Sequence, residues 1–196
     1  MFRTGLQISA LMASLALGWW LGTSSVRQAP EAAVAAERVD AGQRPATGDL
    51  VSVRASFGRD CEEALVGAMD GARTEVLVAI FSLTRRSVTS ALARAAKRGV
   101  KVEVKYDAKS SEESKDMPEA IAFLRRNKVR CAAVEFADSR AKMHHKFTVI
   151  DRRTVLTGSY NYTSTATEAN RENLVRVDSI RVAEAFAAEF AALTRR

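Results

Sequence analysis

Two periods of apolar residues alternate between Asp49 and Arg196, one typical of strands and one typical of helices. Val51 to Phe57 alternates as a half-buried strand does. Glu75 to Leu83 is a nearly continuous apolar run, which predicts a strand covered on both faces. Five later segments also predict strands: Val100 to Tyr106, Val129 to Val134, Lys142 to Ile150, Thr154 to Thr157 and Leu174 to Val177.

Helical spacing of apolar residues separates several of these strands. The expected helices are Glu62 to Ala72, Ser87 to Arg98, Pro118 to about Asn127, and Ile180 to Leu193. The polar stretch Lys109 to Asp116 is assigned neither helix nor strand. Strands that alternate with helices predict an α/β fold, with a mixed central sheet flanked by helices on both faces.

The start of the chain follows neither period. Gly5 to Gly22, after Arg3, is an apolar run of about 18 residues, between a signal peptide and a minimal membrane span, with a buried core helix as the alternative. Residues 23–48 are rich in Ala, Glu, Pro and Gly, which predicts a disordered linker. We therefore expect a signal peptide or membrane anchor in residues 1–22, this linker, and one folded domain in residues 49–196. The expected location is the periplasm, either free or attached to the inner membrane through residues 5–22.

Charge and cysteine content narrow the partners and the class of fold. The formal net charge of +7 favours anionic partners such as nucleic acid or acidic lipid headgroups, with a basic surface that serves only solubility as the alternative. Cys61 and Cys131 are too few for a disulfide-rich scaffold or a four-cysteine zinc site. They can pair in an oxidising compartment or remain two buried thiols.

Candidate chemistry is concentrated in residues 143–161. On a strand, His144 and Lys146 point to the same face and His145 to the other, so an imidazole and an ammonium group converge on one anion. After the turn, Gly158 allows close backbone approach, while Ser159 and Asn161 supply neutral donors. These two segments predict a phosphate-sized pocket, with an exposed hairpin of ordinary polar residues as the alternative.

The spacing of these residues forms a recognisable pattern. Residues 144–161 match H-x-K-x4-D-x6-G-S-x-N without a gap, with Asp151 at the third fixed position, and Glu172 follows in the segment Asn170 to Asn173. This is the signature of the phospholipase D superfamily, which the chain resembles over roughly residues 49–196. Within the superfamily it is most similar to the short bacterial endonucleases and the related mitochondrial-type members, which carry a single motif.

The resemblance implies a phospholipase D-like catalytic domain and a metal-independent phosphodiesterase that needs no cofactor. The motif histidine of the family forms a covalent phosphohistidine, and His144 occupies that position. A second motif histidine protonates the leaving group and then activates water. Because this chain has one motif, that histidine would be His144 of a second copy in a two-fold homodimer. Lys146, Ser159 and Asn161 would hold the phosphate, and Glu172 would accept a hydrogen bond from a His144 ring.

Four neighbouring residues receive other roles. Asp151 lies on the opposite face by parity and is expected to brace the turn rather than touch substrate. His145 is expected to be a packed or surface residue, and no metal site is expected. Tyr160 and Tyr162 either stack on bases at the mouth of the site or pack in the core.

The sequence leaves three hypotheses for the function of the protein. The leading hypothesis is a non-specific endonuclease acting on DNA, RNA or both. Six arginines either line a groove for the nucleic acid or are simply solvated: Arg85, Arg86, Arg125, Arg126, Arg152 and Arg153. The first alternative is a phospholipase D or cardiolipin-type lipid hydrolase, although no second apolar surface is evident near the motif. The further alternative is a non-catalytic nucleic-acid-binding module, against which the intact set from His144 to Glu172 argues.

Overall fold

A computed structural model describes residues 51–138 and 140–193. The predicted signal peptide or anchor in residues 1–22 and the predicted linker in residues 23–48 lie outside the described residues. No helix within the described ranges is both long and apolar enough to cross a membrane.

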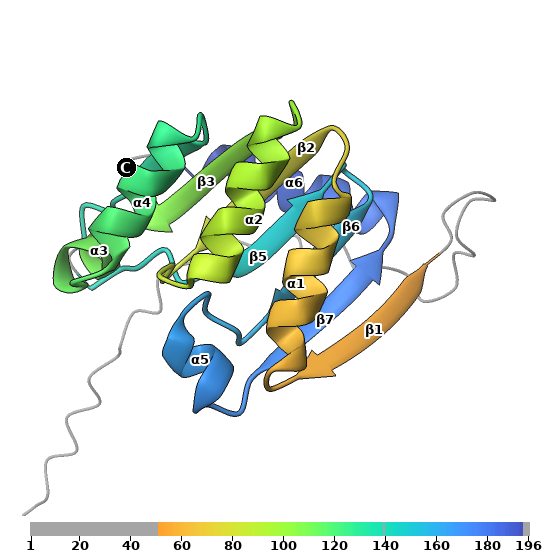
Figure 1. Ribbon diagram of the computed structural model, residues 1–196, viewed down its shortest axis with the longest axis horizontal. Coiled ribbons are helices and arrows are strands. Elements are labelled where there is room, and N and C mark those ends of the chain that lie inside the picture. Colours follow the sequence, from red (N-terminus) through yellow and green to blue (C-terminus); the bar gives the residue numbers. More distant parts are fainter. Residues whose placement is uncertain (1–50, 139, 194–196) are drawn as a thin grey trace, which may run out of the picture. The chain divides into compact units, whose positions relative to one another are not determined.

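A seven-stranded mixed sheet lies at the centre of the fold, in the order β1-β7-β6-β5-β2-β3-β4 (Figure 1). The strands are β1 (Ser52–Phe57), β2 (Glu75–Ile80), β3 (Lys101–Asp107), β4 (Arg130–Val134), β5 (Lys146–Ile150), β6 (Thr154–Gly158) and β7 (Asn173–Asp178). Strands β2, β3 and β4 are parallel to one another, and the remaining neighbours are antiparallel.

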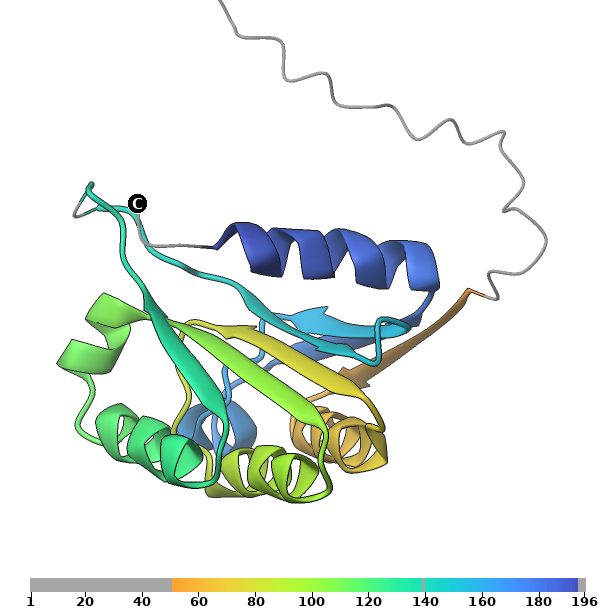
Figure 2. The same cartoon turned by 90° about the horizontal axis from the view of Figure 1, so that it is seen from above.

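Helices cover the two faces of this sheet unequally (Figure 2). The helices are α1 (Asp60–Gly71), α2 (Arg86–Lys97), α3 (Ala108–Glu113), α4 (Met117–Arg126), α5 (Ser164–Glu168) and α6 (Ile180–Ala192). Helix α6 covers one face, where it packs on β2, β5, β6 and β7, and the other helices lie on the opposite face (Figure 2). The α/β fold with helices on both faces of a mixed sheet is therefore confirmed.

Strand β2 shows why the sequence pattern is apolar without interruption. Val76, Val78 and Ile80 belong to the larger core, against α1, α2 and α4, whereas Leu77 and Ala79 belong to the smaller core under α6. Successive side chains of a strand point to opposite faces, so a strand between two cores needs apolar residues at every position. The prediction for this strand is confirmed, except that it ends at Ile80 rather than Leu83.

Strand β1 does not match its prediction of a half-buried strand. It lies at the edge of the sheet, and Val53 and Phe57 are 61% and 66% exposed. Register pairs Val53 with Val177 of β7, on the face that α6 covers further along the sheet. The main contacts of α6 reach β7 but not β1, so no helix of the described residues lies over this face of β1. We call its exposed apolar side chains, Val51, Val53, Ala55 and Phe57, the β1 patch.

Two short helices are absent from the sequence prediction. Helix α3 begins where the Asp107 carboxylate accepts the Ser110 N–H, and α5 begins where the Thr163 hydroxyl accepts the Ala166 N–H. Such caps satisfy free backbone donors at a helix start. Both helices are short and polar, so they carry no apolar period that would reveal them.

Strand β5 is also shorter than the predicted strand over residues 142–150. Residues 142–145 precede it, and the Met143 N–H donates to the Asp107 side chain instead of to a neighbouring strand. The chain is nevertheless extended here, since the Phe81 N–H donates to the His145 carbonyl. Because β5 is antiparallel to β2 and β6, the start of β5 lies beside the ends of both strands. We call this edge of the sheet the histidine end.

Candidate active site

His144 and Lys146 meet at the histidine end. The Lys146 Nζ lies 3.3 Å from His144 Nε2 and 3.4 Å from Nδ1, and donates to the His144 carbonyl oxygen at 3.1 Å. The Lys146 side chain is 9% exposed, whereas His144 is open to solvent. The Phe81 ring packs on the imidazole at 4.6 Å between centroids and lies 5.2 Å from the Lys146 Nζ. An exposed imidazole thus stands over a buried ammonium group.

Burial and neighbouring charge set the protonation of this pair. Burial lowers the pKa of His144, and the positive charges of Lys146 and Lys142 lower it further, while Asp107 acts in the opposite direction. Burial also lowers the pKa of Lys146, which the carboxylate of Glu172 partly offsets. Both shifts favour neutral forms, because an isolated positive charge is poorly solvated there. At neutral pH the imidazole is therefore mostly uncharged and keeps a free lone pair.

His145 points away from this pair, as its parity predicted. Its Nε2 lies 3.1 Å from the Glu189 Oε1 on α6, and its ring packs edge-on against Phe147 at 5.3 Å. The adjacent histidines therefore face different surroundings, although His144 itself lies before the strand rather than within it.

Gly158 ends β6, and Ser159 begins the segment that leads through α5 to β7. The register that pairs Phe147 with Thr157 places Lys146 across from Gly158. A Cβ atom at Gly158 would lie 2.2 Å from the Asn173 carbonyl oxygen, so only glycine fits at this crossing. Gly158 thus allows the backbone of β7 to lie close to that of β6.

Glu172 holds the neighbouring polar groups in place. Its carboxylate accepts hydrogen bonds from the Ser159 hydroxyl and, at 2.9 Å, from the Asn170 side chain. The Asn173 N–H donates to the Ser159 oxygen at 3.1 Å. The predicted bond from Glu172 to a His144 ring is not among the contacts of the described residues, and it stays a prediction for the assembled site.

Asn161 is partly buried and carries an unusual polar atom. Its Oδ1 is buried and has no hydrogen-bond partner among the described residues. An unpaired buried polar group costs roughly 1–3 kcal/mol, and such groups in native proteins call for a specific explanation. Turning the amide by half a rotation would aim its Nδ2 donor at the same space. Asn161 is therefore suited to a partner that comes from outside the chain.

The tyrosines on either side of Asn161 are core residues. Tyr160 and Tyr162 are fully buried, and Tyr162 shares a hydrogen bond of 2.8 Å with the Thr148 hydroxyl. Burial raises the pKa of Tyr160 to about 12. The alternative that these rings stack on bases at the mouth of the site is wrong, because both rings belong to the buried core.

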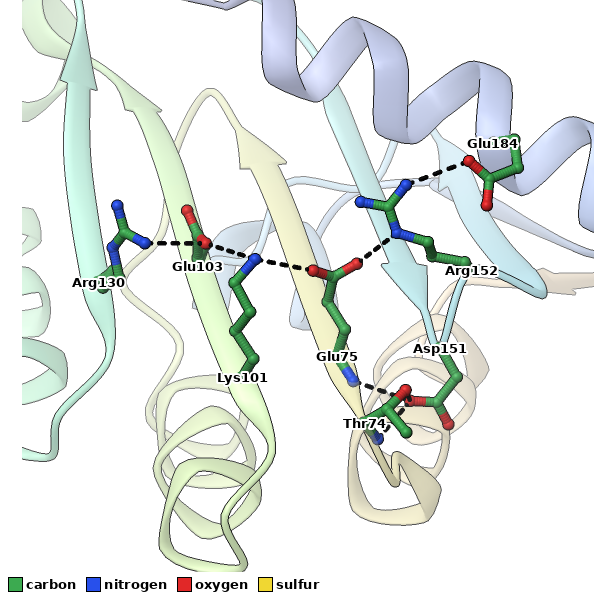
Figure 3. Close-up of polar contacts among 8 residues, drawn as sticks. All are labelled: Thr74, Glu75, Lys101, Glu103, Arg130, Asp151, Arg152 and Glu184. Carbon is green, nitrogen blue, oxygen red and sulfur yellow. Dashed lines mark hydrogen bonds and ion pairs between the residues drawn. The ribbon is translucent and has the colours of Figure 1, made fainter.

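Asp151 lies at the opposite end of β5 from Lys146. Its carboxylate accepts the backbone N–H groups of Arg73, Thr74 and Glu75 at 2.7–3.2 Å. It thereby ties the β5–β6 turn to the start of β2, as the bonds to Thr74 and Glu75 show (Figure 3). Asp151 and Arg152 both have positive φ, which a turn held by these bonds sustains. The third fixed residue of the motif is placed away from the histidine end.

The six arginines do not line one groove, and this prediction is wrong. Arg85 pairs with Glu62 and Glu168, and Arg152 and Arg153 lie at the far end of the sheet with Asp151. Arg125 donates to the Tyr106 hydroxyl and the Cys131 carbonyl. Only Arg86 and Arg126, of the six, line a common cleft, about 290 Å³ in volume, between α2 and α4. Helix and strand directions, rather than sequence proximity, decide where each pair lies.

The two cysteines lie toward opposite edges of the sheet, on α1 beside β1 and on β4, and both are free thiols. Burial raises the pKa of Cys61 and raises that of Cys131 to about 11. Of the two alternatives from sequence, the structure shows unpaired thiols, with Cys61 buried and Cys131 only partly so.

Three residues near His144 escaped the sequence prediction: Phe81, Asp107 and Lys142. Phe81 and Asp107 follow or end parallel strands at the edge where β5 begins. That shared edge was the signal that could have identified them, because ligands bind at the carboxyl ends of parallel strands.

Two open clefts lie at the histidine end. One of about 450 Å³ lies beside His144, and another of about 510 Å³ lies beside Glu172 and Phe57. An apolar surface near the motif was not expected, and the β1 patch corrects that prediction.

An α/β fold with this histidine–lysine pair defines a phospholipase D-like domain. Residues 65–194 match the sequence model of the family described as cardiolipin synthase, PLD-like domain. The chain therefore belongs to the phospholipase D-like family, whose members share a phosphodiesterase fold.

Curated relatives carry names of this family, and a solved structure shares the fold. A phospholipase D of Rickettsia felis is 25% identical over 128 residues, which are 64% of this chain and 60% of that protein. A mitochondrial cardiolipin hydrolase of Danio rerio is 31% identical over 138 residues, covering 70% and 56% of the two chains. The chain thus spans about 60% of the length of such relatives. The crystal structure of Nuc, a phospholipase D family member from Salmonella typhimurium, matches with a TM-score of 0.69 at 24% identity, over 75% of this chain and 100% of Nuc.

Proposed function

We propose that the protein is a metal-independent phosphodiesterase that hydrolyses DNA or RNA with little sequence preference, through a covalent phosphohistidine on His144. The observation that carries the proposal is the contact of an imidazole of lowered pKa with the buried Lys146 ammonium group at 3.3 Å. The neutral imidazole supplies a lone pair for attack on phosphorus, and the ammonium group offsets charge on the phosphoryl oxygens. Ser159 and Asn161 would donate to the remaining oxygens.

The reaction requires two proton-transfer roles. In the first step a ring nitrogen of His144 bonds to phosphorus, the bond to the leaving oxygen breaks, and a protonated histidine gives its proton to that oxygen. In the second step that histidine takes a proton from water, and the water oxygen displaces His144. Since the chain has one motif histidine, the second is His144 of the partner subunit in a two-fold homodimer.

The β1 patch supports dimerisation. Phe57 pairs in register with Asn173, and the Gly58 N–H donates to the Glu172 carbonyl at 3.0 Å, so the patch continues directly into the site. Exposed apolar surface beside polar residues is typical of an interaction surface. A second copy bound there would cover this surface and bring a second histidine end to the first. Sedimentation of the active protein should give a dimer, and a monomeric active species would refute the shared site.

Nucleic acid is favoured as substrate by the net charge of +7 and by the likeness of the single motif to short bacterial endonucleases. Lipid hydrolysis is the second candidate, because the β1 patch also suits a bilayer surface and relatives are named phospholipase D and cardiolipin hydrolase. In that case the apolar residues 5–22 would hold the enzyme at its substrate. Export to the periplasm, with or without attachment to the inner membrane, is part of the proposal under either substrate.

One experiment separates these substrates. The purified protein is incubated in excess EDTA with single-stranded DNA, double-stranded DNA, RNA and cardiolipin vesicles, with His144→Ala as control. Nucleic acid cleavage that survives EDTA and disappears in the control supports the proposal. Turnover of lipid alone would replace it with the lipid hydrolase, and salt-sensitive binding of nucleic acid without turnover would indicate a binding module.

A further inference from the structure

Asp107 is a buried residue outside the sequence motif. It is the last residue of β3, is 3% exposed, and accepts a hydrogen bond with each of its carboxylate oxygens. Its Oδ1 accepts the Ser110 N–H at 2.7 Å, and its Oδ2 accepts the Met143 N–H at 2.8 Å. The first bond caps the short helix α3. The second holds the residue immediately before His144.

The Met143 bond matters because residues 142–145 lie outside the regular sheet. Strand β5 begins at Lys146, so the ladder to β2 starts only after His144. The Met143 side chain is 1% exposed and anchors the segment on the α6 side, while Asp107 holds its backbone from β3. The backbone of His144 is therefore held on one side by the bond from Met143 to Asp107, and on the other by the start of β5 at Lys146.

Asp107 also balances the charges that act on the His144 ring. The groups of the same segment, Lys142, His145 and Lys146, all lower its pKa, and Asp107 from β3 raises it. Phe81, which packs on the ring from the end of β2, is uncharged. A carboxylate buried close to an imidazole stabilises its protonated form.

We propose that Asp107 is a positioning residue for His144, which fixes the approach of the imidazole to phosphorus through the Met143 N–H. The negative charge of the same carboxylate acts against the neighbouring lysines and so favours the protonated imidazole. The proposal rests on the proposed function of His144. Asp107 does not touch the substrate. A role limited to capping α3 would affect folding but not the titration of His144.

The test is Asp107→Asn, with Asp70→Asn as the matched control. Asparagine keeps the size of the side chain, removes its charge, and turns an N–H donor toward one of the two backbone N–H groups. Asp70 loses the same charge on the far end of α1, where it pairs with Arg94 at 2.7 Å. Thermal unfolding of each variant, and kcat and KM across pH, are measured on the full chain with the best substrate.

We expect kcat of Asp107→Asn to fall about tenfold or more, since small displacements of a reacting group cost that much. We also expect the pH of maximum kcat/KM to move lower, because loss of the negative charge lowers the pKa of His144. Asp70→Asn should change neither quantity. A lower kcat with an unchanged pH optimum, or an unchanged kcat, would overturn the proposal.

Two further measurements separate the other outcomes. If Asp107→Asn does not fold, Asp107→Glu keeps the charge on a longer arm, and it should lower kcat while the pH optimum stays; an unchanged kcat would overturn the proposal. If the unaltered protein turns over no phosphodiester, the proposed function fails first. The midpoint of His144 titration by NMR then decides on Asp107, because it must fall when Asp107 or its charge is removed and must stay in Asp70→Asn.

Discussion

At the end of the sheet where β2 and β3 begin, charged side chains of opposite sign alternate across the strands to α6 (Figure 3). The order of this ion-pair ladder is Arg130, Glu103, Lys101, Glu75, Arg152 and Glu184, with successive partners 2.9–3.3 Å apart. At the histidine end, the buried Lys146 instead contacts an imidazole and an aromatic ring. A lysine is thus paired with carboxylates at one end of the sheet, whereas the lysine at the other end contacts an imidazole and an aromatic ring.

This difference shifts the pKa values of Lys101 and Lys146 in opposite directions. Glu103 and Glu75 raise the pKa of Lys101, which is largely exposed, whereas burial lowers the pKa of Lys146. A neutralised ladder has little to gain from an incoming anion. Among the described residues, no carboxylate forms an ion pair with Lys146 at the histidine end, so a phosphate bound there would gain the most electrostatic energy. Paired charges stabilise the fold, and under the proposed function the unpaired charge of the histidine end is available for substrate.

The largest effect is expected at the histidine end. His144→Ala removes the proposed nucleophile and should lower kcat by about 10⁴-fold or more. His145→Ala, the matched control on the opposite side of the segment, should retain most activity because its ring contacts Glu189 on α6. Steady-state assays in EDTA measure both. Equal losses would contradict the different directions of the two rings.

Glu172→Gln should have the next largest effect, a fall in kcat of about 100-fold with a smaller change in KM. The amide keeps the shape of the side chain but loses the charge that the Ser159 hydroxyl and a His144 ring would use. Separate determination of kcat and KM checks this. A variant with the rate of the unaltered protein would show that Glu172 does not orient the histidine.

At the far end, Asp151→Asn should lower stability by about 2 kcal/mol at neutral pH while kcat stays within about twofold. Burial alone would raise the pKa of Asp151, but the N–H groups of Glu75, Thr74 and Arg73 outweigh it and lower the pKa. A lowered pKa stabilises the folded state above the unfolded-state pKa of about 3.9, and this contribution is lost as pH falls through the folded-state pKa. Urea unfolding at several pH values should show the difference between the two proteins shrinking in acid.

The smallest effect is expected within the ion-pair ladder. Lys101→Ala should cost about 0.5 kcal/mol or less, because an exposed ion pair gains little over the hydrated charges. The cost should decrease further in about 1 M salt, where exposed charges are screened. Urea unfolding at low and high salt measures it. A loss as large as that for Asp151→Asn would show that the ladder, and not the turn, holds this end together.

Local sequence patterns predicted most of the fold and the segments that carry the candidate site residues. Gly158 and Ser159 follow β6 directly, so their placement across from Lys146 was implied once adjacent strands were assigned. The pattern failed where a polar side chain replaces the strand ladder, as Asp107 does for Met143. It left the place of Tyr160 open, since an aromatic beside a motif looks the same in sequence whether a short helix covers it or not.

The sequence by itself determined the alternation of strands and helices, the two-sided burial of β2, and the opposed directions of His144 and His145, because each follows from the period of the backbone. Only the tertiary structure decided which residues from distant segments surround His144, where the arginine pairs lie, and that β1 is left exposed beside the site. These features depend on strand order and on how far α6 reaches across the sheet. Contacts between segments far apart in the chain carry no local period, so folding must bring them together before their chemistry is visible.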